Sequence, residues 1–328
     1  MSQLPLVAGV DIGGTKILAG VANAAGELLS QDYRTTPVEA GSDAGIDRIV
    51  TSIERAAHGA GISPSQLSGV GIAIAGLVES ETGVLHTSPN MPGWKDVPIR
   101  SLLGSRLGLD IYVINDASAA ALGEGCYGAG RGVANLVYLT VSTGIGAGII
   151  AGGRLYCGAN GTAGELGHMI IEADGPPCAC GGHGCLEALA SGTAMAKEAI
   201  SRIQAGARSS LGRMAGGDID NITARHIELA ARQGDGLAQG VIARAAHYLG
   251  LGLANIVNIF DPELIIIGGG VAKMWDLLVE PAIQRMQARA YALWHFRVRV
   301  VPAELGDRAG VLGAVAFVLQ HRSAEKGQ

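Results

Sequence analysis

The segment from Gly164 to Glu187 carries the side chains best suited to bind a metal ion. Its four candidate ligands, one imidazole and three thiols, are His168, Cys178, Cys180 and Cys185. Tetrahedral Zn²⁺ prefers such soft ligands, and the intervening glycines let the backbone turn tightly around an ion. A disulfide fits less well, because a Cys-x-Cys pair closes poorly and nothing in the chain indicates an oxidising compartment. The segment therefore predicts a structural zinc site, in which His183 is the competing imidazole.

Two glycine-containing turns could bind phosphate. The first, Gly13-Gly14-Thr15-Lys16, follows a short apolar run, and the second, Ser142-Thr143-Gly144-Ile145-Gly146, follows another. Backbone N–H groups, hydroxyls and the ammonium of Lys16 are all suited to phosphate oxygens. A Gly-Gly pair is also common in ordinary hairpin turns, so the first turn alone does not establish such a site.

Asn115 and Asp116 lie where an apolar run ends and a run of small residues begins. An aspartate at this point can cap the following helix. It can also act as a general base, because a carboxylate at the end of a strand is well placed to accept a proton. The local pattern alone favours the cap.

The elements that must position these residues follow from the apolar periodicity. Strands are predicted at 6–10, 17–22, 69–75, 111–114, 136–141, 147–150, 264–267 and 297–301, and helices at 43–60, 192–206, 223–233, 236–260 and 308–321. The strand-turn-strand pattern at the start recurs near residue 136, which indicates a duplicated α/β architecture of mixed sheets with helical cover.

Composition restricts the class of protein. At 328 residues the chain is long enough for two domains, which leads us to expect a binding cleft. The net charge of −5 and the lack of a Lys/Arg run argue against a nucleic-acid-binding protein and favour small-molecule partners.

The segment 132–153 is uncharged, but its glycines and hydroxyl side chains predict two strands and no membrane span. Residues 1–5 show no secretory signal, and the five cysteines fit a reduced compartment, so we expect a cytoplasmic protein.

Three motifs in this order resemble the ROK family of sugar kinases and repressors, within the actin-like ATPase superfamily. They are Asp11 to Lys16, Val141 to His168 and Cys178 to Glu187. The resemblance implies a two-lobed actin-like ATPase fold, also called ribonuclease H-like, with duplicated mixed sheets and a structural zinc loop. Residues 1–118 with 309–328 would form a small N-terminal lobe. Residues 119–308 would form a larger lobe with the zinc element and oligomer contacts, in a homodimer or homotetramer.

The resemblance also assigns roles in phosphoryl transfer. Asp116 would be the general base, and Asp11 would hold Mg²⁺ through water. Glycines 268 to 270 would let adenosine approach the backbone, although a plain turn is the alternative. The predicted ATP and phosphate contacts are Asp11, Gly13, Gly14, Thr15, Lys16, Thr143, Gly144, Gly146, Gly268, Gly269 and Gly270.

Sugar binding would fall to residues near the zinc ligands and the general base. Glu165 and Glu187 are harder oxygen donors than the thiolates, which leaves them for substrate. His168 would bind zinc through one ring nitrogen and a sugar hydroxyl through the other. The predicted sugar contacts are Asn90, Asn115, Asp116, Glu165, His168 and Glu187. Trp94 would either stack on a sugar face or anchor its loop.

The activity implied by the resemblance is ATP-dependent phosphorylation of a hexose, with Asp116 as base. The loop from Asn90 to Trp94 resembles glucose-using members, which favours D-glucose and the product glucose 6-phosphate. Kinases for N-acetylglucosamine, N-acetylmannosamine or fructose share the same fold, and polyphosphate is an alternative phosphoryl donor.

A sugar-responsive repressor would need a DNA-binding domain before the first strand. A non-catalytic sugar-binding protein is disfavoured by the intact Asp11, Lys16 and Asp116, and a nicotinamide-dependent dehydrogenase by the absence of its glycine motif.

Overall fold

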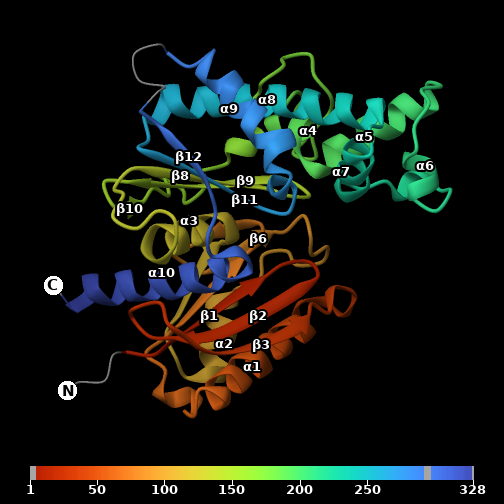
Figure 1. Ribbon diagram of the computed structural model, residues 1–328. Helices are drawn as coiled ribbons and strands as arrows, with labels where there is room; N and C mark the ends of the chain where they lie inside the picture. Colours follow the sequence, from red (N-terminus) through yellow and green to blue (C-terminus); the bar gives the residue numbers. More distant parts are fainter. Residues whose placement is uncertain (1–4, 292–296, 327–328) are drawn as a thin grey trace. The chain divides into compact units, whose positions relative to one another are not determined.

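The computed structural model describes residues 5–291 and 297–326 (Figure 1). Residues 1–4, on which the expectation of no secretory signal partly rests, lie outside the described residues. By compactness the chain divides into unit 1, Met1–Tyr138 with Gly148–Gly164 and Ala303–Gln328, and unit 2, Leu139–Ala147 with Glu165–Pro302. This division assigns 119–138, 148–164 and 303–308 to unit 1. The lobe boundaries implied by the resemblance place these segments in the larger lobe, and those boundaries stay a prediction.

The first sheet has the strand order β3-β2-β1-β4-β7. Its strands are β1 (Val7–Ile12), β2 (Lys16–Ala22), β3 (Leu28–Thr35), β4 (Val70–Ile74) and β7 (Ile111–Asn115). The first three pair antiparallel, whereas β1, β4 and β7 run parallel. The parallel strands are almost fully buried, and so they appear in the sequence as continuous apolar runs. The edge strand β3 alternates between half-buried and exposed residues, and the apolar pattern therefore did not predict it.

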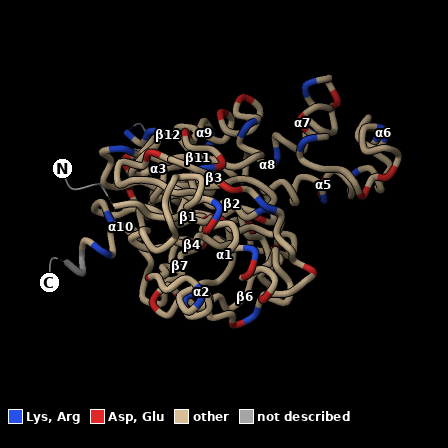
Figure 2. Tube along the Cα trace, turned by 90° about the horizontal axis from the view of Figure 1, so that it is seen from below, with Lys and Arg blue, Asp and Glu red and all other residues tan. Residues whose placement is uncertain are grey.

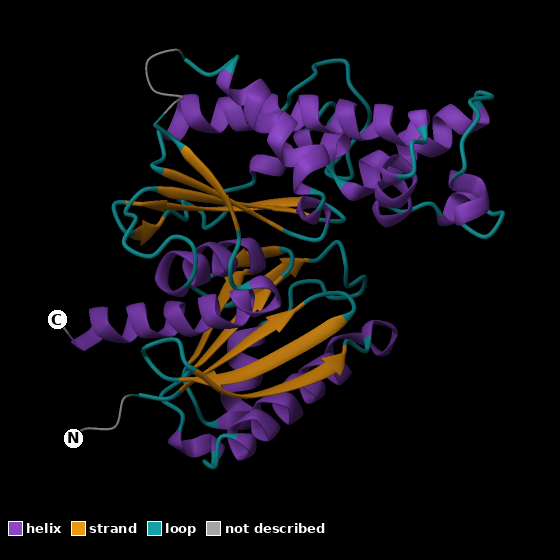
Figure 3. Ribbon diagram, viewed as in Figure 1, coloured by secondary structure: helices purple, strands orange, loops and turns teal. Residues whose placement is uncertain are grey.

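Helices cover both faces of this sheet (Figures 1 and 3). They are α1 (Gly41–Gly59), α2 (Ile99–Leu107), α3 (Asp116–Tyr127) and α10 (Ala309–Lys326). Helix α1 packs on β2 and β3, while α10 packs on β1, β4 and α3. A two-stranded sheet of β5 (Leu77–Glu79) and β6 (Val84–Thr87) adjoins β7. Neither α2 nor this small sheet was predicted from the sequence.

The second sheet has the order β10-β9-β8-β11-β12. Its strands are β8 (Leu136–Val141), β9 (Ile145–Ala151), β10 (Arg154–Leu155), β11 (Leu264–Gly268) and β12 (Arg299–Pro302). Antiparallel β9–β10 and parallel β11–β12 pairs occur in it, so both large sheets are mixed. The duplicated α/β architecture of mixed sheets and helices is confirmed. The uncharged segment 132–153 holds β8 and β9, as its glycines and hydroxyls predict.

The helices of unit 2 are α4 (Leu186–Ala190), α5 (Gly192–Gln204), α6 (Leu211–Met214), α7 (Ala224–Arg232), α8 (Gly236–Phe260) and α9 (Glu280–Gln287). Helix α8 is long and apolar enough to cross a membrane by length and composition, but 61% of its most apolar window is buried. It packs against α4, α5, α7 and α9, which is the environment of a core helix. Shorter helical turns are η1 (Val38–Ala40), η2 (Pro64–Gln66), η3 (Leu166–His168), η4 (Ile219–Asn221), η5 (Val271–Lys273), the π-helix η6 (Trp275–Val279) and η7 (Gly306–Arg308).

Charged residues are distributed over the whole described trace. Lys and Arg are interspersed with Asp and Glu along both units (Figure 2). This distribution agrees with the absence of a Lys/Arg run in the sequence.

Candidate active site

The first phosphate turn joins β1 to β2 in unit 1. It is closed by a hydrogen bond from Gly13 N–H to Lys16 C=O at 2.9 Å, and the Thr36 hydroxyl donates to the Gly13 carbonyl at 2.7 Å. Gly14 lies against Asn90, because a Cβ on Gly14 would approach the Asn90 Cβ to 2.9 Å. Thr15 is exposed at the tip. The turn therefore has a fixed shape and contacts one of the predicted sugar-binding residues.

Asp11, at the end of β1, is a carboxylate of the candidate site whose pKa is strongly raised. Burial and the negative charge of Asp116 together raise its pKa to about 7, although the ammonium of Lys16 acts to lower it. Lys16 Nζ lies 3.9 Å from Asp11 Oδ2 and 3.6 Å from Asp307 Oδ1. A cation bound beside Asp11 would favour its ionised form, which suits the predicted Mg²⁺ role.

Asn115 is the N-cap of α3. Its side-chain oxygen accepts from the N–H groups of Ala117 at 3.0 Å and Ser118 at 3.1 Å, and its amide donates to Gly76 C=O at 3.2 Å. The capping that the local sequence pattern would assign to Asp116 is therefore done by its neighbour. Asp116 is the first residue of the helix, where the positive end of the helix dipole stabilises a carboxylate. Its role as general base stays a prediction.

The loop from Ser88 to Gly93 places Asn90 at the surface, whereas Trp94 is 2% exposed. The Trp94 ring packs on Gly45 of α1, where a Cβ would overlap the indole. Of the two interpretations drawn from the sequence, the structure supports the loop anchor, because a buried ring cannot stack on a sugar.

The second phosphate turn, between β8 and β9, is tied to Glu187. Ile145 N–H donates to Glu187 Oε2 at 2.8 Å, and a Cβ on Gly144 would overlap the same carboxylate. A side chain at 144 would therefore displace the Glu187 carboxylate from the turn. Thr143 C=O accepts from Thr193 N–H at 3.3 Å. Glu187 thus fixes one turn that is predicted to bind phosphate, and its own role in sugar binding stays a prediction.

The glycines that follow β11 also lie close to β8. Gly269 has φ of +93°, and a Cβ there would overlap the carbonyl of Val141. Only glycine combines this backbone conformation with this approach. Whether Gly268, Gly269 and Gly270 contact adenosine stays a prediction.

The four predicted zinc ligands come together in unit 2. Their ligand atoms all lie within 4.8 Å of one another, and the group contains His168 and not His183. The Sγ atoms of Cys180 and Cys185 are 3.7 Å apart, and Cys178 Sγ is 3.6 Å from His168 Nδ1. Zn–S bonds of about 2.3 Å in a tetrahedron place two sulfurs about 3.8 Å apart. The donor set and its spacing therefore fit zinc.

His168 presents its two ring nitrogens to different neighbours. Nδ1 faces the cysteine cluster, while Nε2 lies 3.8 Å from Glu165 Oε2. The side chain of Glu165 is 56% exposed and can contact a substrate. This arrangement is the one expected of a histidine that binds a metal through one nitrogen and a substrate hydroxyl through the other.

Two residues near Asp11 were not predicted from the sequence. Asp307 pairs with Lys16 from the turn before α10, and Gly310 lies so close to Asp11 that a Cβ would be 2.8 Å from the carboxyl carbon. In the sequence, glycines at 306 and 310 stand on either side of Asp307. They are a weak indication of a functional turn, because the chain has 51 glycines.

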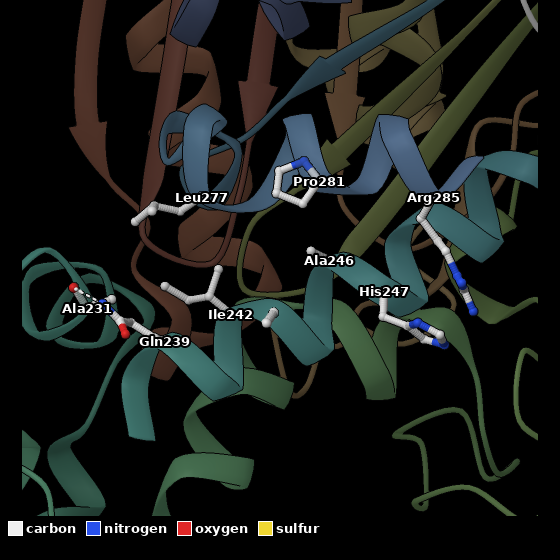
Figure 4. A pocket seen from close by; sticks show the side chains of 9 residues that line it. Ala231, Gln239, Ile242, Ala246, His247, Leu277, Pro281 and Arg285 are labelled. Atoms are coloured by element: carbon white, nitrogen blue, oxygen red, sulfur yellow. Dashed lines mark hydrogen bonds between the residues drawn. The ribbon is translucent and has the colours of Figure 1, made fainter. Parts of the chain in front are cut away.

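A cavity of about 380 Å³ lies elsewhere in unit 2, between α8 and α9 (Figure 4). It is lined by Ala231, Gln239, Ile242, Ala243, Ala246, His247, Leu277, Pro281 and Arg285. None of the predicted site residues lines it, so its place in the fold is separate from that of the candidate site.

The sequence matches the model of the ROK family over residues 7–321. The chain belongs to the ROK family. Among its ROK relatives, a glucokinase of Thermotoga maritima is 36% identical, covering 97% of this chain and 98% of the relative. A putative xylose repressor of a Caldicellulosiruptor species is 34% identical, covering 96% of this chain and 78% of the repressor. A crystal structure of a ROK glucokinase from Streptomyces griseus, in complex with glucose and AMPPNP, has a TM-score of 0.82 at 36% identity, covering 96% of this chain and 99% of that one.

Proposed function

We propose that this chain is an ATP-dependent hexose kinase that converts D-glucose to glucose 6-phosphate. The observation that carries the proposal is the match to glucokinases over nearly their full length, in a chain that retains Asp11, Lys16 and Asp116. Phosphoryl transfer needs positioned phosphate donors, charge neutralisation and a base for the attacking hydroxyl. Each need has a candidate residue.

The base in this proposal is Asp116. Its carboxylate accepts the proton of the terminal sugar hydroxyl as that oxygen attacks the γ-phosphorus, and ADP is the leaving group. Asn115 is the N-cap of α3, so most of the capping remains when the Asp116 side chain is changed, although Asp116 Oδ1 also accepts from Ala117 N–H at 2.9 Å. Asn90, Asn115, Glu165, His168 and Glu187 bind the sugar hydroxyls.

The phosphate groups are held by the two glycine turns. Lys16 gives up contact with Asp11 and Asp307 to neutralise phosphate oxygens, and backbone N–H groups of 13–15 and 143–146 donate to the remaining ones. Asp11 would hold Mg²⁺ through water, and the bound ion would neutralise charge on the transferred group. The enzyme would act in the cytoplasm as a homodimer or homotetramer.

Zinc would be held by His168, Cys178, Cys180 and Cys185 and would orient the imidazole without joining the transfer. The ligands come from η3 and from the loop before α4, two segments too short to form a core of their own. A bound ion would therefore fix the sugar-facing nitrogen of His168.

The test is a coupled ADP-release assay on the purified chain with a panel of sugars. Glucose should give the highest kcat/KM, above N-acetylglucosamine, N-acetylmannosamine, fructose and xylose. Replacement of ATP by polyphosphate tests the donor. Turnover of an amino sugar above glucose would reassign the substrate. Sugar binding without turnover of any sugar would instead support a non-catalytic role, such as that of a sugar-responsive repressor.

A further inference from the structure

Glu124 is a completely buried carboxylate in the second half of α3. Its Oε2 accepts from the backbone N–H groups of Ala129 at 2.9 Å and Glu304 at 3.2 Å. Its Oε1 accepts from Leu305 N–H at 2.8 Å. Within the described residues no ion pair neutralises this carboxylate. Three backbone donors therefore hold the charge in place.

A carboxylate suits this position, because each of its two oxygens can accept from the surrounding backbone N–H groups. Both oxygens of Glu124 act as acceptors, whereas an amide offers a single accepting oxygen and a nitrogen that only donates. A glutamine at 124 would direct an N–H group at a backbone N–H in either orientation. Gly128 leaves room for this arrangement, because a Cβ there would overlap Oε2.

The hydrogen bonds connect two segments that carry site residues. Helix α3 begins with Asp116, the proposed base. Glu304 and Leu305 lead directly into η7, which carries Asp307 beside Lys16, and then into α10, where Gly310 packs on Asp11. All of these residues belong to unit 1. Helices α3 and α10 are in extensive contact, with Gly123 of α3 packed on Ala309 of α10 (Figure 1).

We propose that Glu124 is a positioning residue for phosphoryl transfer, which fastens the helix of the base to the corner that contacts Asp11 and Lys16. The effect on rate rests on the proposed function. Glu124 contacts neither substrate nor reacting atoms. It acts by keeping Asp116 at a fixed spacing from Asp11 and Lys16, and a displacement of about 1 Å in such a site costs up to a hundred-fold in rate.

The decisive variant is Glu124→Gln, with Glu304→Gln as matched control. Glu304 lies in the segment whose backbone binds Glu124. Its own side chain is exposed, and the carboxylate lies 4.0 Å from the guanidinium of Arg131. We expect Glu124→Gln to lower kcat about ten- to hundred-fold while the stoichiometry of glucose binding by calorimetry stays that of the wild type. The control should keep both values. A fall in stoichiometry that parallels the fall in kcat would show only partial unfolding and would overturn the positioning role.

Hydrogen exchange on the protein without substrates tests the contact independently of activity. The amides of Ala129, Glu304 and Leu305 should exchange faster in Glu124→Gln than in the wild type and the control. If the wild type phosphorylates no sugar, the proposed function fails while the exchange result still decides whether the contact exists. Unchanged exchange, or faster exchange with an unchanged kcat, would overturn the inference.

A second variant covers the case in which Glu124→Gln does not fold. Leu305 has φ of −80°, which proline can adopt, so Leu305→Pro removes one donor with little backbone change. It should lower kcat in the same direction at unchanged glucose stoichiometry. An unaffected kcat in this variant would contradict the proposal.

Discussion

At the scale of single residues, the two adjacent polar side chains at the end of β7 divide two tasks. Asn115 accepts from two helix N–H groups and donates to Gly76, so it builds the start of α3. Asp116 follows in the first turn, and its charge contributes to the high pKa of Asp11. The N-cap is thus a different side chain from the proposed base, so Asp116 can be changed without removal of Asn115.

We expect Asp116→Asn to abolish turnover and preserve sugar binding. An amide cannot accept the hydroxyl proton, and the loss of a general base lowers kcat by about 10²- to 10⁴-fold. Steady-state kinetics and calorimetry with glucose measure the two effects separately. Asp220→Asn, at an exposed position, is the control. A kcat within about three-fold of wild type would refute the assignment of the base.

At the scale of elements, local structure is held together by a few side chains at helix starts and in the zinc loop. Asp235 caps α8 through Ala238 N–H at 3.0 Å and also accepts from Ser210 N–H at 2.6 Å. The four predicted zinc ligands bring η3 next to the loop before α4. Both features join segments that the chain separates, so their loss should reduce stability.

The cap of α8 predicts a dependence of stability on pH. Hydrogen bonds from Ala238, Ser210 and Ser209 lower the pKa of Asp235 to about 2 in spite of partial burial. Because the folded pKa lies below the unfolded value of 3.8, the stabilisation is present above pH 3.8 and is lost as pH falls toward 2.

Asp235→Asn keeps a capping oxygen but removes the charge, so we expect a loss of about 1 kcal/mol at pH 7. The difference in unfolding midpoint between wild type and variant should shrink below about pH 4. Thermal unfolding at several pH values measures this difference. A difference that stays constant down to about pH 2 would contradict a stabilising role for the Asp235 charge.

Removal of one zinc ligand should release the ion. We expect Cys180→Ser to lower bound zinc from about one per chain to near zero, to lower the unfolding temperature and to weaken glucose binding, because His168 loses its fixed orientation. Elemental analysis of untreated protein, with calorimetry, measures these effects. Cys126→Ser, outside the cluster, is the control. Zinc content equal to wild type in Cys180→Ser would exclude this ligand set.

At the scale of the whole molecule, the residues that we propose for phosphoryl transfer and sugar binding are distributed over both units. Asp11, Lys16 and Asp116 belong to unit 1, whereas the zinc cluster and Glu187 belong to unit 2. A ligand that binds the folded chain alone raises its stability by mass action, which allows substrates to be compared without an activity assay.

Glucose at about a hundred times its dissociation constant should stabilise the protein by about 2.7 kcal/mol. We expect a corresponding rise in unfolding temperature of a few degrees for wild type and for Asp116→Asn, and a much smaller rise for Cys180→Ser at the same concentration. Scanning fluorimetry measures it, with xylose as the sugar control. A larger shift with xylose than with glucose would favour the repressor-like alternative.

The sequence by itself determined the features that neighbouring residues encode. The buried strands β1, β4 and β11 and the long helix α8 follow from apolar runs and their bounding glycines, since burial on both faces needs continuous apolar residues. The zinc ligands are also local, because chemistry and spacing within one loop define them. Edge strand β3 was not predicted, because it alternates between half-buried and exposed residues and its sequence is hard to distinguish from that of a polar loop.

Only the tertiary structure decided which distant residues meet. Lys16 reaches Asp307, Glu124 binds the backbone at 304 and 305, and Trp94 is buried against α1. The choice of Asn115 over Asp116 as cap likewise depended on backbone geometry at one residue. The first two contacts arise from the packing of α3 and α10 on the sheet, and the third arises from the packing of a loop on α1. Packing depends on the whole chain, and no short sequence pattern records it.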